Sequence, residues 1–229
     1  VHEEISNESA LALQRFLKYL NIPFFPKGDM AQNVQKVLKS VAGEDFEQVV
    51  SLIVLKSMQQ AYYGPKALGH FGLGFEDYTH FTSPIRRYPD LIVHRCLKSL
   101  IDYSEPPYLF EDLQFIGEKS SELERIAQKA ERDLIKLKSC RLMKERVGEI
   151  FQAIISGVTK FGIFVSLNDP PIEGLIPLRF LTDDFYLVKE DEYTVVGRKY
   201  GKRFRLGDPL EVQLSKVDVE AMKIDFDLT

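Results

Sequence analysis

The sequence contains no apolar run long enough to cross a membrane. A membrane-spanning helix needs about 18 or more consecutive apolar residues, whereas the longest candidate, residues 49–55, contains Ser51 and is followed by Lys56. The N-terminus also lacks a basic segment followed by an apolar stretch, which is the pattern of a secretory signal. The sequence therefore predicts a chain with no membrane partner.

Cysteine and histidine are also scarce. Cys96 and Cys140 are the only cysteines and lie far apart in the sequence, so we expect free thiols in a reducing cytoplasm in preference to a disulfide. The four histidines show no spacing with cysteines or carboxylates that is typical of a metal site. The residues present thus predict a cytoplasmic location and no metal ligands in this chain.

Positive and negative charges nearly balance, but they are distributed unevenly. The 229 residues carry a net charge of −4, with 45% hydrophobic and 28% charged residues, as in an ordered globular protein. Residues 147–229 contain 10 Lys and Arg against 14 Asp and Glu, which leaves 20 of each sign in residues 1–146. Within this acidic half, five cations fall within eight residues: Arg198, Lys199, Lys202, Arg203 and Arg205. Because the local potential decides whether a polyanion is attracted, the net charge does not exclude a nucleic acid.

Residues 1–146 show helical periodicity. Apolar residues recur every three or four positions behind Ser6, which we expect to cap a first helix. A second helix is expected from Met30 to about Gly43. Three further helices are expected at residues 46–62, 90–101 and 111–146.

The pattern changes at residues 147–148 to short alternating stretches. Segments such as "FQAIISGVTKFGIFVSL" and "DPLEVQLSKVD" alternate apolar and polar residues, and Gly, Asn, Asp and Pro separate them. About five short strands in a segment of this length fit a small OB-type β-barrel. We therefore expect an α+β multidomain chain, mainly helical at residues 1–146 and a five-stranded barrel at residues 147–229.

The segment "THFTSPIRRYPDLIVHR" at residues 79–95 is unusual for an ordinary helix. Pro84 suits the first position of a helix that one of the two preceding hydroxyl residues would cap. Unpaired amides at a helix N-terminus suit a phosphate, and Arg86 and Arg87 add guanidinium groups that bind phosphate oxygens in pairs. The turn therefore predicts a phosphodiester clamp, with a capped helix whose arginines pair with surface carboxylates as the alternative.

Residues 69–95, "GHFGLGFEDYTHFTSPIRRYPDLIVHR", resemble the signature of the ribonuclease II / ribonuclease R (RNB) family, and most closely its ribonuclease R members. "LKSMQQAYYGP" and "AERDLIKLKSCRLM" resemble the helices that precede and close this signature. Residues 147–229 resemble the OB-type RNA-binding domain, named after a ribosomal protein, that ends ribonuclease R. The resemblance implies that residues 1–146 are the C-terminal portion of an RNB catalytic domain.

Members of that family are processive 3′→5′ exoribonucleases that hydrolyse single-stranded RNA to nucleoside monophosphates with Mg²⁺. By resemblance, Arg86 is the catalytic arginine that contacts the scissile phosphate, a role that agrees with the need for positive charge where transition-state charge grows. The resemblance implies that six residues shape the RNA path around it: Tyr78, His80, Thr82, Ser83, Arg87 and Glu131. For Glu131, an exposed helix carboxylate that pairs with a neighbouring base is an equal alternative.

The aspartate cluster that binds Mg²⁺ in this family, with the spacing D-x5-D-x-D-D, is absent from the sequence. The pairs Asp183 with Asp184 and Asp225 with Asp227 are interpreted as solvated carboxylates. The resemblance therefore implies that the Mg²⁺ ligands belong to the N-terminal remainder of the enzyme or to a partner chain. We expect the 229-residue chain to bind RNA without hydrolysing it.

The barrel is expected to bind RNA through aromatic rings beside cations. The resemblance points to Phe161 and Phe164 with Lys160 nearby; the alternative is that one ring belongs to the core, because three positions along a strand change its face. Arg198 and Lys199 are expected to contact phosphates, with a solvated hairpin as the alternative.

Two other hypotheses stay open. One is a non-catalytic RNA-binding module in which the helices serve as a scaffold. The other is a structural relative in which Arg86 pairs with an acid. A D-x5-D-x-D-D motif encoded in frame upstream of Val1 would select the enzyme, whereas a start codon near Val1 would select the module or a split enzyme.

Overall fold

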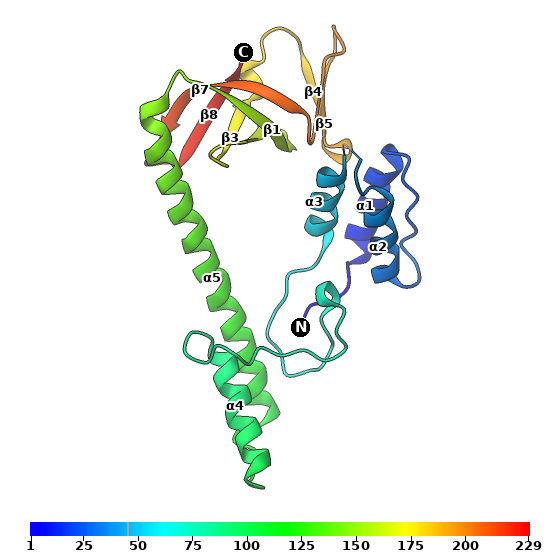
Figure 1. The fold of residues 1–229 in the computed structure, drawn as a ribbon, viewed down its shortest axis with the longest axis vertical. Helices are drawn as coiled ribbons and strands as arrows, with labels where there is room; N and C mark the ends of the chain where they lie inside the picture. Colours follow the sequence, from blue (N-terminus) through cyan, green and yellow to red (C-terminus); the bar gives the residue numbers. More distant parts are fainter. Residues whose placement is uncertain (45) are drawn as a thin grey trace.

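The computed structural model describes residues 1–44 and 46–229, and it places a helical part beside a β-barrel (Figure 1). Three helices come first: α1 (Asn7–Tyr19), α2 (Met30–Ser40) and α3 (Glu47–Ser57). A loop with the short 3-10 helix η1 (Phe71–Leu73) leads to α4 (Tyr88–Ile101), which packs beside the long α5 (Phe110–Met143). The 3-10 turn η2 (Lys144–Arg146) joins α5 to the strands. Among the helices described, none is both long and apolar enough to cross a bilayer.

Side-chain caps set the starts of the first two helices. The Oγ of Ser6 accepts the backbone N–H of Ser9 at 3.2 Å, so the predicted cap of α1 is confirmed. Asp29 caps α2 in the same way, by accepting the backbone N–H of Gln32 at 2.9 Å. Both helices thus begin where a local hydrogen bond satisfies an N–H group that has no intrahelical partner.

The third helix is shorter than predicted. It ends at Ser57, and the expected continuation to Tyr62 is wrong. Beyond it the chain pairs with the N-terminal segment instead: the Gln59 side chain donates to the carbonyl of Glu4, and the N–H of Tyr62 donates to the carbonyl of Val1. These long-range contacts replace the helical hydrogen bonds that the sequence pattern favours.

Five strands form the closed barrel that the sequence predicts. Their order around the barrel is β1 (Ile150–Thr159), β2 (Gly162–Leu167), β3 (Glu173–Pro177), β8 (Lys223–Leu228) and β7 (Pro209–Asp218), with β7 pairing back to β1. All neighbours are antiparallel except β3 and β8. This is the small OB-like barrel expected at residues 147–229.

A second sheet of three strands was not predicted. It consists of β4 (Tyr186–Lys189), β5 (Thr194–Gly197) and β6 (Arg203–Arg205), inserted between β3 and β7 of the barrel. Two short 3-10 helices, η3 (Leu178–Phe180) and η4 (Glu190–Glu192), flank β4. Strands of three or four residues are too short to give a clear alternation in the sequence.

Alternating side chains fill the barrel. Ile163, Val165 and Leu167 of β2 are at most 2% exposed and face the barrel interior. Register shifts in β1 and β7 bend these strands, which helps the sheet to close. Gly174 of β3 permits close packing, because a Cβ at this position would overlap the ring of Phe226.

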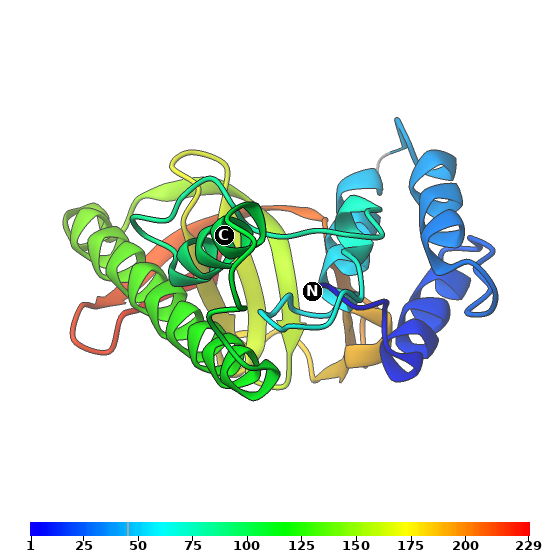
Figure 2. The same cartoon turned by 90° about the horizontal axis from the view of Figure 1, so that it is seen from below.

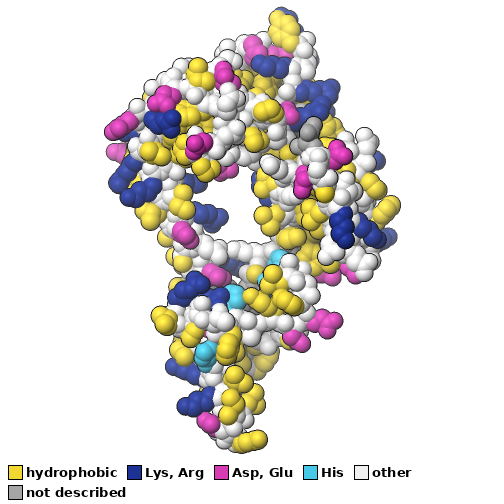
Figure 3. Space-filling model, in the orientation of Figure 1, with side chains coloured by type: hydrophobic (Ala, Val, Ile, Leu, Met, Phe, Trp, Pro, Cys, Tyr) yellow, Lys and Arg dark blue, Asp and Glu magenta, His cyan; other side chains and the backbone are white. Residues whose placement is uncertain are grey.

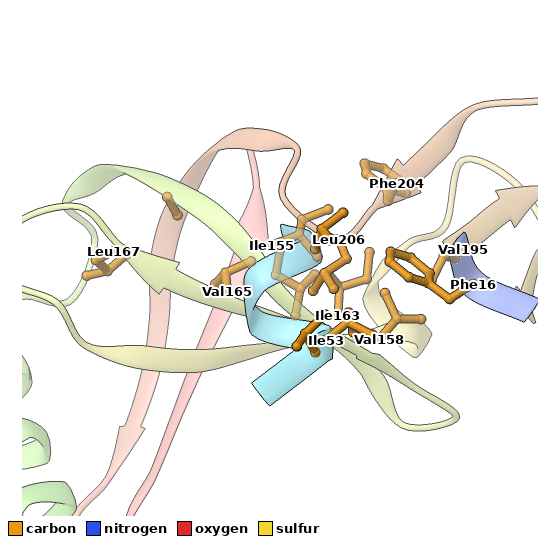
Figure 4. Close-up of a cluster of buried hydrophobic side chains, with 14 of the residues drawn as sticks. Phe16, Ile53, Ile155, Val158, Ile163, Val165, Leu167, Val195, Phe204 and Leu206 are labelled. Atoms are coloured by element: carbon orange, nitrogen blue, oxygen red, sulfur yellow. The ribbon is translucent and has the colours of Figure 1, made fainter. Parts of the chain in front are cut away.

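The helical part and the barrel share one hydrophobic core (Figure 4). Ile53 of α3 lies among barrel residues that include Val158 and Ile163. Phe16 of α1 lies beside Val195 of the three-stranded sheet. From below, α1 to α3 stand on one side of the barrel and α5 runs along the other (Figure 2), while α4 lies beside the end of α5 that is far from the barrel (Figure 1). Packing, and not only the chain connection through α5, therefore holds the barrel against the helical part.

Candidate functional site

A single turn before α4 carries the two predicted arginines. The backbone N–H groups of Arg86 and Arg87 both donate to the carbonyl of Ser83, at 3.2 and 3.0 Å. These two hydrogen bonds close the chain into one compact turn. The side chains of Arg86 and Arg87 therefore extend from a backbone whose conformation is fixed by hydrogen bonds.

The first helical position predicted at Pro84 is wrong, whereas the helix predicted at residues 90–101 is present. α4 begins at Tyr88, with Arg87 as an extended N-cap residue that makes no side-chain cap. A helix from Pro84 would place Pro89 in its interior, where the missing N–H and the ring would disrupt the helical hydrogen bonds. In the structure Pro89 lies in the first turn of α4, where no N–H is required.

The two arginines have different surroundings. The Arg86 side chain is exposed, and within residues 1–44 and 46–229 it makes no hydrogen bond or ion pair. The Arg87 side chain is 21% exposed, and its Nη2 donates to Oδ2 of the buried Asp90 at 2.8 Å. Pairing with a carboxylate, the alternative raised for both arginines, therefore describes Arg87, while Arg86 is open to a ligand.

A cavity of about 410 Å³ is lined in part by the loop that leads into this turn. Its walls include Tyr78 and His80 from the loop before the turn, Tyr63 from the segment after α3, and Glu124 and Gln128 from α5. His80 precedes Ser83 by three residues, so the turn follows directly from the cavity wall, although none of residues 82–87 lines the cavity.

A wider hollow separates the barrel, α5 and α1 to α3 in the space-filling view (Figure 3). Lys or Arg side chains stand on its α5 side, and a histidine lies at its lower edge. Cationic groups beside an open passage suit a polyanion.

Aromatic rings pack together on the cavity wall. The ring of Tyr78 lies 4.9 Å from that of His70, 6.0 Å from that of Phe75 and 5.8 Å from that of His80, measured between centroids. The hydroxyl of Tyr63 and Nδ1 of His80 form a hydrogen bond of 3.0 Å. Burial lowers the pKa of His80, and the charge of Arg87 acts in the same direction, which favours the neutral imidazole. Flat rings without charge are suited to stacking against nucleobases.

α5 approaches the cavity closely. The backbone N–H of Tyr63 donates to Oγ of Ser121 at 2.8 Å. A Cβ on Gly117 would lie 2.7 Å from the carbonyl oxygen of Tyr63, so only glycine fits this contact without a shift. Glu131 is exposed and follows the cavity-lining Gln128 by three residues, which places it on the same side of α5.

The β1–β2 hairpin presents the predicted aromatic pair outside the barrel. Lys160 and Phe161 form its two-residue tip, and the Phe161 side chain is 79% exposed. Phe164 is half-buried on the outer side of β2, between its pairing partners Gly157 and Leu175. Because Phe161 belongs to the tip and not to the strand, strand alternation does not force the two rings onto opposite faces.

The basic cluster lies on the turn between β5 and β6. The carboxylate of Asp184 accepts the backbone N–H groups of Lys199 and Tyr200 at 2.8–2.9 Å, which orders this turn. The Lys199 ammonium lies 4.8 Å from the centroid of the Tyr200 ring, and the Arg198 side chain is exposed. This arrangement is compatible with both interpretations of the cluster: contact with phosphates and a solvated hairpin.

Sequence reasoning missed Asp90, Tyr63 and the α5 residues of the cavity. Asp90 is 0% exposed, and the available signal was its position three residues after Arg87, a spacing at which side chains on a helical turn meet. Tyr63 lies in the segment "LKSMQQAYYGP", for which the sequence predicts only a helix, and Glu124 lies in a helix without a local motif. Tertiary packing brings both to the cavity.

The residues of this chain do not fit the Mg²⁺ site that the resemblance implies. Within residues 1–44 and 46–229, no group of three or more His, Cys, Asp or Glu side chains is placed to hold a metal ion. The carboxylate of Asp184 is occupied by backbone N–H groups instead.

Two domain families match the chain. Residues 1–103 match the RNB domain, and residues 144–228 match the S1 RNA binding domain. The Arg86 turn lies in the first match and the Phe161 hairpin in the second.

Curated relatives are similar over most of the chain. Ribonuclease R of Aquifex aeolicus is 44% identical over 196 residues, which cover 85% of this chain and 28% of that protein. Ribonuclease R of Escherichia coli is 35% identical over 241 residues, which cover 100% of this chain and 30% of that protein. The chain thus spans about 30% of the length of these relatives.

Solved structures show the same fold. Mycoplasma genitalium RNase R, in its apo form and in complex with ribose methylated single-stranded RNA, gives a TM-score of 0.91 at 28% identity, covering 100% of this chain and 37% of that one. Yeast Ssd1, a pseudonuclease, gives a TM-score of 0.68 at 20% identity over 85% of this chain and 25% of that one, and shares the fold alone. This chain belongs to the ribonuclease II / ribonuclease R (RNB) family, and it combines an RNB segment with an S1 RNA-binding domain.

Proposed function

We propose that this chain provides the RNA-binding and phosphate-clamping part of a 3′→5′ exoribonuclease of the ribonuclease R type. The observation that carries the proposal is Arg86, an exposed guanidinium on an ordered turn that directly follows the cavity-lining Tyr78 and His80. Support comes from the curated relatives named ribonuclease R and from the M. genitalium structure with single-stranded RNA.

In this proposal Arg86 is the catalytic residue that contacts the scissile phosphate. Its planar guanidinium donates two parallel hydrogen bonds to phosphate oxygens and stabilises the charge that grows on them. The 3′-terminal bases stack near the rings on the cavity wall, and the residues proposed to line the RNA path are Tyr78, His80, Thr82, Ser83 and Glu131.

The barrel holds the RNA strand farther from its 3′ end. Phe161 and Phe164 stack with bases, Lys160 contacts the backbone beside them, and Arg198 and Lys199 contact phosphates from the basic cluster. We place the division between the catalytic portion and the RNA-binding domain at residues 146 and 147.

Hydrolysis requires a cluster of metal ligands that residues 1–44 and 46–229 do not bring together. We propose that the N-terminal remainder of the enzyme, or a partner chain, carries the Mg²⁺ ligands. We also propose a cytoplasmic location, since Cys96 and Cys140 are both free thiols.

The test is an equilibrium titration of labelled single-stranded RNA with the 229-residue chain, with and without Mg²⁺. We expect binding without release of nucleoside monophosphates. Arg86→Ala should weaken binding by about tenfold, the effect of losing one charge-assisted contact. Lys39→Ala, which removes an exposed cation from α2, should leave the affinity unchanged. Equal affinities for the wild type and Arg86→Ala would contradict the proposal.

A non-catalytic RNA-binding module is the second candidate. The fold that this chain shares with a yeast pseudonuclease favours it, because the fold is compatible with loss of catalysis. Turnover by the full-length protein distinguishes the two. Degradation that Arg86→Ala slows selects the enzyme, and RNA binding without degradation selects the module.

A further inference from the structure

A fully buried carboxylate lies beneath the Arg86 turn. Asp90 is 0% exposed, although it belongs to the first turn of α4, where a carboxylate could remain in water. Burying an ionised carboxylate is unfavourable unless hydrogen bonds and an opposite charge compensate for the lost water. The hydrogen-bond partners of Asp90 therefore indicate which part of the structure the buried carboxylate holds in place.

Asp90 binds both ends of the turn through one oxygen. Its Oδ2 accepts the backbone N–H of Ser83 at 2.8 Å and Nη2 of Arg87 at 2.8 Å. Ser83 opens the turn and Arg87 closes it, and the carbonyl of Ser83 accepts the N–H groups of Arg86 and Arg87. Arg86 thus stands on a segment that is fixed at both ends.

Stability alone does not explain this arrangement. Two buried atoms of the pair, Nε of Arg87 and Oδ1 of Asp90, have no hydrogen-bond partner within the described part of the chain. Unsatisfied buried polar atoms destabilise the folded state. If the Arg87–Asp90 pair served stability alone, we would expect both atoms to have hydrogen-bond partners. Apolar residues of similar volume would otherwise be at least as stabilising as the pair.

We propose that Asp90 is a positioning residue whose buried carboxylate fixes the Ser83–Arg87 turn and so presents the Arg86 guanidinium to a phosphate of bound RNA. The inference rests on the proposed function of Arg86 and adds the residue that orients it. Arg87 acts with Asp90 in this role, because its Nη2 donates to the buried carboxylate and so holds the end of the turn.

The electrostatics of the pair agree with this geometry. Burial alone would raise the pKa of Asp90, but the N–H of Ser83 and the guanidinium of Arg87 outweigh it, and the pKa lies below its usual value. The carboxylate is therefore ionised at neutral pH and holds both donors.

The first test measures the turn itself by amide hydrogen exchange in the 229-residue chain. Asp90→Asn keeps an acceptor for the N–H of Ser83 and loses the charge pair with Arg87, whereas Asp90→Ala loses both. Exchange at Ser83, Arg86 and Arg87 should accelerate in Asp90→Asn and more in Asp90→Ala, while the amides in the later turns of α4 stay protected. Unchanged exchange in both variants would overturn the proposal.

The second test asks whether Asp90 acts through Arg86. Asp90→Asn and Arg86→Ala are combined in a double-mutant cycle, with single-stranded RNA affinity as the readout. We expect each single variant to lose up to about tenfold in affinity, and the double variant to lose no more than Arg86→Ala alone. The same Asp90→Asn change combined with Phe161→Ala, on the separate β1–β2 hairpin, should give additive losses.

The outcomes separate this inference from the function on which it rests. Additive losses for Asp90→Asn and Arg86→Ala would show that Asp90 acts independently and would overturn the positioning role. An unchanged affinity in Arg86→Ala would refute the phosphate contact of Arg86. It would also refute the claim that Asp90 presents Arg86 to RNA. Hydrogen exchange then decides on its own whether Asp90 holds the turn.

Discussion

At the scale of single residues, chemically identical neighbours in this chain serve different purposes. Arg86 and Arg87 are adjacent, yet one side chain is exposed and the other is paired with a buried carboxylate. Two aromatic residues of the barrel differ in a similar way, because Phe161 is at an exposed tip while Phe164 packs along β2. Exposure and partners, and not residue type, decide which group is open to a ligand.

Phe161→Ala should weaken RNA binding without destabilising the barrel. The ring is 79% exposed at the tip of the hairpin, so its removal leaves no cavity, and the loss of one stacked base costs about 1–3 kcal/mol in binding. Fluorescence anisotropy with single-stranded RNA measures the affinity, and thermal unfolding measures stability. Phe25→Ala removes a ring of similar exposure, 70%, from the loop before α2 and serves as the control. Equal RNA affinities for both variants would contradict the role of Phe161.

At the scale of elements, predictions succeeded where a long pattern or a local hydrogen bond defines the structure. The helix after Ser6 has both an apolar stripe and a capping hydroxyl. The barrel strands β1 and β7 each have 10 residues, enough for alternation to be visible. These elements were therefore readable from the sequence alone.

The predictions failed where distant contacts override local preference. α3 ends early because the segment after Ser57 pairs with the N-terminus, and Pro84 does not begin a helix because Pro89 would then lie in the helix interior. Of the candidate site, the Arg86 turn came from a resemblance, whereas the buried Asp90 and the α5 wall of the cavity depend on tertiary packing. No periodicity in the sequence reports such contacts.

Gly174→Ala should destabilise the barrel by about 1–3 kcal/mol, the usual cost of overpacking a filled core. The added methyl group would overlap the Phe226 ring and would lie 2.8 Å from the carbonyl oxygen of Ile224. Gly157→Ala is the matched control, because its Cβ would meet Phe164 at an ordinary contact distance of 3.5 Å. Urea unfolding gives both free energies. Equal values for the two variants would show that close packing at Gly174 is not required.

At the scale of the whole molecule, the helical part and the barrel share one hydrophobic core, so we expect them to unfold as one cooperative unit. Ile53 of α3 is 3% exposed and belongs to the same core cluster as the barrel residues around Val158. The boundary suggested by the change in sequence pattern is therefore not a boundary between independent cores. In the proposed function, this shared core limits the movement of the β1–β2 hairpin relative to the helical part.

Ile53→Ala should reduce the stability of both parts together. Truncating a buried isoleucine costs about 2–5 kcal/mol, and here the cavity would open between α3 and the barrel. Hydrogen exchange at barrel amides and at α1 to α3 amides should accelerate by similar factors. Leu55→Ala, which removes a side chain that is 66% exposed from the same helix, should change neither. Acceleration confined to the helices would show that the barrel is stable by itself.

The salt dependence of RNA binding tests the central claim most directly. Each phosphate contact of a single strand contributes about 0.7 to the slope of log affinity against log salt concentration. If Arg86 contacts a phosphate, the slope for Arg86→Ala should be smaller in magnitude than that of the wild type by about this amount, while Lys39→Ala keeps the wild-type slope. Identical slopes for the wild type and Arg86→Ala would contradict a phosphate contact at this turn.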